Sequence, residues 1–150
     1  MSPPQQTTNK WSSALLIATA HLFLIPICFY VWFFPAHTLA LDGMMSLVFL
    51  NYLFSLGFWF SPVRGSLNHR IDAVAARVSL VTIILFVSLF GRLSDEARTW
   101  FVVIMGLMIA FFYLSDKFSS TKGGWCSPGH IAAHCAAHLC ATVALFYLFV

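Results

Sequence analysis

The sequence of 150 residues is too apolar and too weakly charged for a protein that folds in water. Apolar residues make up 60% of it and charged residues 9%, with a formal net charge of +3, whereas a soluble domain carries about a quarter charged residues. Most of the surface must therefore face lipid, and no basic run indicates nucleic-acid binding. We predict an all-α integral membrane protein in contact with membrane lipids. Its four cysteines are expected to be free thiols, because no extracellular module needs disulfides.

Five apolar runs follow one another along the chain, each close to the ~20 residues that cross about 30 Å of hydrocarbon. The first has about 22 residues and contains His21 and Pro26. It exceeds the roughly 7–15 residues of a signal-peptide core, so we expect it to remain in the protein. The sequence therefore predicts a polar tail over 1–12 and a single transmembrane domain over 13–150. That domain is a bundle of five helices, at about 13–34, 39–60, 73–91, 99–114 and 130–150.

The positive charges favour one orientation of this bundle. With five spans, the N-terminal tail shares a side with the second and fourth loops. That side carries six of the eight Lys and Arg residues, and the other side carries only Arg92 and Arg98. Because cytoplasmic loops are enriched in Lys and Arg, we predict a cytoplasmic N-terminus and an exoplasmic C-terminus. The six are Lys10, Arg64, Arg70, Arg77, Lys117 and Lys122.

Polar residues of three spans are expected to meet at the cytoplasmic side. Ser55 and Trp59 lie near the end of the second span, and Asp72 lies at the start of the third. The fifth span starts on the same side and carries three histidines in its first half. A spacing of four residues places them on one helix face, about 6 Å apart along the axis. These are His130, His134 and His138.

Metal binding is one chemistry that this set of residues supports. Imidazoles at i and i+4 can share a zinc ion, and a carboxylate such as that of Asp72 can complete or orient the site. Zinc with an open position activates water at neutral pH, so a hydrolase of lipid amides or esters is a reasonable hypothesis. Asp72 and Ser55 are then the candidate catalytic residues, and Asp72 is alternatively a metal ligand or the ion-pair partner of Arg70 or Arg77.

Two other interpretations of the histidine stripe stay open. Polar residues in membrane helices often hydrogen-bond across helices simply to hold the bundle together, and alanines flank these histidines. The stripe, with His21 of the first span, is also suited to ligate haem or a pigment. The chain would then be a small non-enzymatic subunit or assembly factor of a larger membrane complex, with other membrane proteins as its partners. A transporter is less favoured, because no repeat symmetry is evident.

Residues 61–85 (SPVRGSLNHRIDAVAARVSLVTIIL) and 130–138 (HIAAHCAAH) resemble the hemolysin III and progestin/adiponectin-receptor family. That family belongs to a larger group of membrane hydrolases that includes the alkaline ceramidases. The group's pattern is S-x3-H in the second span, an Asp at the start of the third, and H-x3-H in the last. Ser55, Asp72, His130 and His134 match it, and the resemblance implies a zinc ion on the cytoplasmic side.

The chain departs from the family pattern at two points. Trp59 stands where the pattern has its first histidine, so the resemblance implies a zinc ligand from elsewhere, with His69, His138 or His21 as the replacement. The family also has seven spans, whereas this sequence predicts five. The resemblance therefore suggests either a metal-dependent lipid hydrolase or a degenerate relative of one.

Overall fold

The computed structural model describes residues 10–35, 37–91 and 93–149, and these form an all-α bundle. Its five helical segments are long and apolar enough to cross a membrane, which confirms the predicted fold class. The first segment is the succession α1 (Lys10–Ala20), a 3₁₀ turn η1 (His21–Phe23) and α2 (Leu24–Phe33). The others are α3 (Leu39–Trp59), α4 (Leu67–Phe90), α5 (Asp95–Ser120) and α6 (Pro128–Phe146), and a final 3₁₀ turn η2 (Tyr147–Phe149) follows α6.

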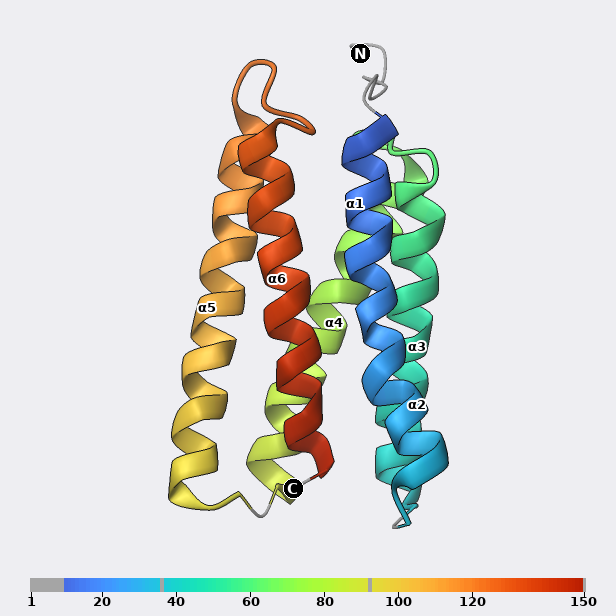
Figure 1. The fold of residues 1–150 in the computed structure, drawn as a ribbon, viewed down its shortest axis with the longest axis vertical. Helices are drawn as coiled ribbons and strands as arrows, with labels where there is room; N and C mark the ends of the chain where they lie inside the picture. The colour runs from blue at the N-terminus through green and yellow to red at the C-terminus, as the bar shows by residue number, and fades with distance from the viewer. Residues whose placement is uncertain (1–9, 36, 92, 150) are drawn as a thin grey trace.

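Two pairs of helices are joined by an oblique fifth (Figure 1). α5 packs along α6, and α1 with α2 lies beside α3. α1 also packs against α6, which holds the two pairs together on one face of the bundle. α4 packs mainly on α3 and reaches η2 with its far end, so it crosses from one pair to the other.

The chain alternates between the two ends of the bundle as the five-span prediction requires. The start of α1, the α3–α4 connection and the α5–α6 connection lie at one end, which we call the loop end (Figure 1). The α2–α3 and α4–α5 connections and the end of α6 lie at the other, the far end. The tail predicted over 1–12 falls largely outside the described residues, and its last part, from Lys10, already belongs to α1.

The orientation in the membrane is a prediction that cysteine labelling can test. In a cysteine-free background, we expect Ser61→Cys and Lys122→Cys, both at the loop end, to react with an impermeant maleimide only from the cytoplasmic side. Ser94→Cys, at the far end, should react only from the exoplasmic side. The reason is the excess of Lys and Arg at the loop end. Labelling of Ser61→Cys and Ser94→Cys from one side would contradict the five-span arrangement.

The predicted start of the third span was wrong, with consequences for the site. α4 begins at Leu67 rather than at 73, because the Ser66 hydroxyl caps it by accepting a hydrogen bond from the His69 backbone N–H at 3.2 Å. His69 and Asp72 therefore lie in the first two turns of a helix instead of in a loop. The charged stretch before 73 hid this start, since charge alone does not prevent helix formation.

The other caps extend the last two spans in the same way. Ser94 caps α5 by accepting from the Ala97 N–H at 3.2 Å, and α5 runs over Asp95–Ser120 instead of the predicted 99–114. Ser127 caps α6, whose first residue is Pro128, the helix position at which proline is best tolerated. In the first span the turn η1 precedes Pro26, whose ring excludes the normal backbone bond to the residue four earlier.

The apolar core is concentrated toward the far end. Buried side chains of all five segments meet there in one large cluster, which includes Met44, Met45, Val87, Phe101 and Leu148. A second, much smaller cluster at the loop end contains Leu16, Phe58, Trp59, Ile131 and Cys135. The space between helices at the loop half of the bundle is therefore not filled by the main core.

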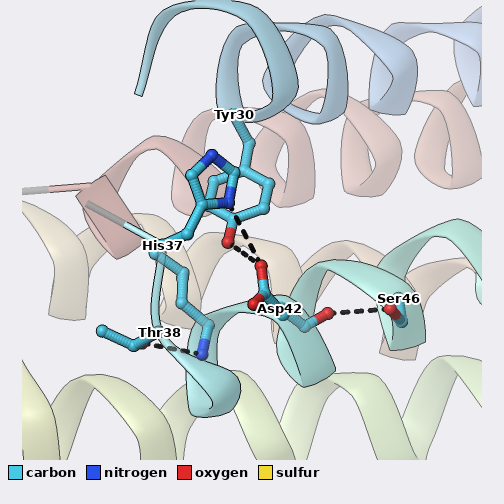
Figure 2. A network of polar contacts seen from close by, with 6 residues as sticks. Tyr30, His37, Thr38, Asp42 and Ser46 are labelled. Carbon is cyan, nitrogen blue, oxygen red and sulfur yellow. Dashed lines mark hydrogen bonds and ion pairs between the residues drawn. The ribbon is translucent and has the colours of Figure 1, made fainter. Parts of the chain in front are cut away.

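A polar network fastens the α2–α3 connection at the far end (Figure 2). The buried Tyr30 hydroxyl donates a hydrogen bond to the Asp42 carboxylate, and His37 Nδ1 lies 3.2 Å from the same oxygen. The Thr38 hydroxyl caps α3 by accepting from the Leu41 N–H at 3.2 Å. His37 and Asp42 are both exposed. Their link to Tyr30 is an addition that the sequence did not indicate.

Candidate functional site

A cavity of about 260 Å³ lies between α3, α4, α5 and α6 in the loop half of the bundle. Its wall is polar toward the loop end and apolar toward the middle of the bundle, where Leu80, Ile83, Met108 and Leu145 lie. The cavity thus has the two-part lining that fits an amphiphilic molecule. The predicted site residues that line its polar part are Ser55, Asp72, His130, His134 and His138.

The cavity reaches the protein surface between α4 and α5. Arg77 on α4, with Ile109 and Asp116 on α5, line the cavity and are also exposed. α4 packs on α3 whereas α5 packs on α6, so the cavity separates two helices that are not close neighbours. Both belong to membrane-spanning segments. The exposed part of the cavity wall therefore belongs to membrane-spanning segments.

Each histidine of the stripe is fixed by a hydrogen bond at Nδ1. His130 Nδ1 accepts the backbone N–H of Cys126 at 2.9 Å, which places the proton of the neutral ring on Nε2. His138 Nδ1 lies 3.1 Å from Thr19 Oγ1, and the Thr19 hydroxyl donates to the Leu16 carbonyl at 3.1 Å. His138 therefore donates from Nδ1 and keeps an accepting lone pair on Nε2.

His134 is the middle member of the stripe and contacts both of the others. Its ring centroid lies 6.0 Å from that of His130 and 4.8 Å from that of His138. Its Nδ1 lies 3.1 Å from Ser115 Oγ on α5, a partner that the sequence did not indicate. Since a hydroxyl both donates and accepts, His134 can present either a donor or an acceptor at Nε2. The stripe thus combines a donor, an acceptor and one adaptable group.

Asp72 is the acidic group of the cavity. It is buried, with 9% of its surface exposed, and it lines the polar part of the wall. Ser55 of α3 is also buried and lines the same cavity. The structure therefore brings together the two residues that were predicted to be catalytic.

The alternative in which Asp72 pairs with Arg70 or Arg77 is not found among the described side chains. Arg77 directs its guanidinium to the Ala73 carbonyl at 3.4 Å, within its own helix, and Arg70 is exposed. Asp72 thus faces the cavity without a cationic partner from α4. The ion pairs of the described residues lie at the far end of the bundle, and they are His37–Asp42 and Arg98–Asp95.

Trp59 fills the position at which the family pattern has a histidine. It is 1% exposed, and its ring centroid lies 5.2 Å from that of His134 and 6.3 Å from that of His130. Trp125, from the α5–α6 connection, stacks on it at 6.2 Å, and the Arg64 guanidinium lies over the Trp125 ring at 5.7 Å. The indoles therefore close the cavity toward the loop end.

Buried polar atoms without a hydrogen-bond partner gather around this cavity. Within the described part of the chain there are four such side-chain atoms, and all belong to residues that line the cavity. Trp125 and Ser79 were not singled out from the sequence, although Ser79 lies seven residues after Asp72 and so on the same face of α4. The four atoms are Asn51 Oδ1, Trp59 Nε1, Ser79 Oγ and Trp125 Nε1.

The arrangement does not fit a zinc ion. In residues 10–35, 37–91 and 93–149, no group of three His, Cys, Asp or Glu side chains is placed to hold a metal. The lone pair of His130 Nδ1 is used by the Cys126 N–H, and its Nε2 then carries a proton. Zinc in the cavity stays a prediction from the histidine spacing and the resemblance.

His21 lies apart from the cavity. Its side chain is exposed, its Nδ1–H donates to the Ile17 carbonyl at 2.7 Å, and its ring lies edge-on to Tyr52 at 5.6 Å. The structure therefore does not bring His21 together with the histidine stripe, as a shared haem site would require. Ligation of haem or a pigment stays a prediction.

Cys126 next to His130 is a poor nucleophile or ligand. Burial raises the pKa of its thiol to about 11, so the thiolate is scarce at neutral pH. The four cysteines are free in the structure, as the sequence predicts. Comparison of the sequence with family models and curated proteins, and of the fold with solved structures, found no match.

Proposed function

We propose that this membrane protein binds a single-chain amphiphile in the cavity, entering sideways from the lipid. The polar head would lie among Asp72, Ser55 and the histidine stripe. The alkyl chain of the amphiphile would lie against the apolar wall, toward Ile83 and Leu145. This is the function expected of a relative of the membrane hydrolases that has kept the binding cavity and lost the metal.

The observation that carries the proposal is the coincidence of the cavity with the unpartnered polar atoms. A buried polar group without a hydrogen bond costs about 1–3 kcal/mol, and lipid supplies no compensating partner. Four such atoms around one cavity are explained if its usual content is polar at that end. The apolar wall, and the exposed wall residues on two membrane-spanning helices, then favour an amphiphile over a soluble polar ligand.

A metal-dependent lipid hydrolase is the second candidate. It is favoured by the placement of Ser55, Asp72 and His134 along the wall of one cavity. The lack of a three-ligand group in the described residues stands against it. A non-enzymatic subunit of a larger complex is compatible with the exposed apolar surface, but no feature of the described residues identifies a partner.

Filling the cavity tests the binding proposal. Ala76 is half-buried on α4 and lines the cavity, so Ala76→Phe should occupy ligand space while adding apolar contacts. We expect the purified parent to retain a one-to-one adduct of dodecanol by native mass spectrometry in a short-chain detergent. Ala76→Phe should weaken that binding at least about tenfold, which corresponds to ~1.4 kcal/mol.

Ala110→Phe is the matched control, because Ala110 lies on α5, is exposed and does not line the cavity. It should bind dodecanol like the parent. Equal loss in both variants, or equal binding in all three proteins, would refute a ligand in this cavity.

A further inference from the structure

Asp72 differs from every other acidic residue of the chain in its burial. The sequence contains five Asp and Glu residues, and the other four are exposed. Asp72 lines the cavity with no Lys, Arg or His nitrogen of the described side chains within 4.0 Å. A buried carboxylate is normally paired with a cation, because burying a lone charge is far more costly than burying a neutral polar group.

The neighbouring groups offer acceptors and no fixed positive charge. On α3, Ser55 lines the same cavity as Asp72, and Asn51, one helical turn before Ser55, has an unpartnered Oδ1. Ser79 on α4 also has an unpartnered hydroxyl oxygen. These oxygens can accept hydrogen bonds from a group that carries several N–H donors.

The charged and titratable groups of the facing helices do not occupy the position beside the Asp72 carboxylate. Arg77 of α4 is exposed and bonded to its own helix. α5 contributes the exposed Asp116, a second negative charge at the opening. From α6, His134 is held by Ser115. The charged groups at the exposed part of the cavity wall are thus Arg77 and Asp116, and neither forms an ion pair with Asp72 among the described residues.

From this geometry we propose that the amphiphile carries an ammonium head, which binds as the missing cation beside Asp72. The inference rests on the proposed function and specifies its ligand class: a long-chain primary amine. The ammonium donates to the Asp72 carboxylate and to the oxygens of Ser55 and Asn51. The unpartnered indole N–H groups of Trp59 and Trp125 cannot bind an ammonium, and they are left for water or a hydroxyl.

Three probes that share the same alkyl chain and differ in the head group separate the contribution of the head group from that of the alkyl chain. Dodecylamine, dodecanol and dodecanoic acid are titrated separately into the full chain, with binding read by native mass spectrometry. A charge-assisted hydrogen bond in a buried site is worth more than a neutral one. We expect dodecylamine to bind about ten- to a hundredfold more tightly than dodecanol. Dodecanoic acid should bind most weakly, because its charge repels that of Asp72.

Asp72→Asn keeps the shape and removes the charge, so it should abolish the preference for the amine over the alcohol. Asp95→Asn, at the exposed start of α5, is the control and should keep the preference. If Asp72→Asn does not fold, the three-probe comparison on the parent still tests whether the cavity prefers an ammonium head. Equal binding of amine and alcohol, or a preference that survives Asp72→Asn, overturns the ammonium proposal alone. Failure of all three probes to bind overturns the proposed function as well.

Discussion

Replacing Trp59 with histidine is expected to destabilise the protein and to make its stability more dependent on zinc than that of the parent. Trp59 is almost fully buried among Phe58, Trp125 and His134. Removal of a buried tryptophan down to alanine costs about 3–5 kcal/mol. Histidine fills part of the space, so we expect a loss of about 2–3 kcal/mol in the free energy of unfolding on the same scale.

The zinc dependence follows from the position of the new imidazole. It would stand on α3 next to the rings of His134 and His130, in the place that the family pattern gives to a ligand. His130 would have to release the Cys126 N–H to bind. Zinc at about a hundredfold above its dissociation constant would restore ~2.7 kcal/mol, since it binds only the folded state.

Unfolding in mixed micelles, with and without added zinc, measures both effects. Trp100→His is the control, because Trp100 is an exposed tryptophan in the part of α5 that lies at the far end of the bundle. It should lose little stability and gain none from zinc. A destabilised Trp59→His that does not respond to zinc would mean that no latent site exists, and the resemblance to metal-dependent hydrolases would lose its main chemical support.

Enlarging Ala137 should weaken the bundle by about 1–3 kcal/mol, the usual range for overpacking. Ala137 is 0% exposed on α6, and Ala20 is likewise 0% exposed on α1, the helix that packs against it. Small residues permit this close approach in membrane helices. Leucine at 137 must push neighbours apart, because Ala137 has no exposed surface and does not line the described cavity.

Ala132→Leu supplies the comparison for Ala137→Leu, since Ala132 is on the same helix and exposed. Its free energy of unfolding should match the parent within about 0.5 kcal/mol. Equal stability of Ala137→Leu and Ala132→Leu would show that α6 has room at 137 and that its small residues are not required for packing.

Hydropathy and loop spacing were sufficient to predict the five spans, because a span must be long and apolar whatever its neighbours are. The residues at which the helices begin were harder to predict from the sequence. The starts of α4 and α5 depend on hydrogen bonds from Ser66 and Ser94, which a hydropathy pattern does not register. The predicted starts, at 73 and 99, therefore lie several residues after the observed starts of α4 and α5.

The order of the five spans decides which helix ends share a side of the membrane. This was sufficient to place Ser55, Asp72 and the histidines at the same end of the bundle. The sequence could not show which ring nitrogen each histidine uses, because the partners of His130, His134 and His138 come from a loop and two other helices. Nor could it show that Trp125 stacks on Trp59 from a connection far along the chain. These tertiary contacts set the ring orientations and the lining of the cavity, which the sequence alone leaves open.

The uneven distribution of the core predicts where the protein opens first. The large apolar cluster and the Tyr30–Asp42–His37 network fasten the far end, whereas the loop half surrounds a cavity. Local opening has its lowest free energy where buried contacts are few. Amide protons in the loop half of α4 and α5 should therefore exchange with solvent deuterium by fraying that leaves the far end folded, and a bound amphiphile should slow their exchange selectively.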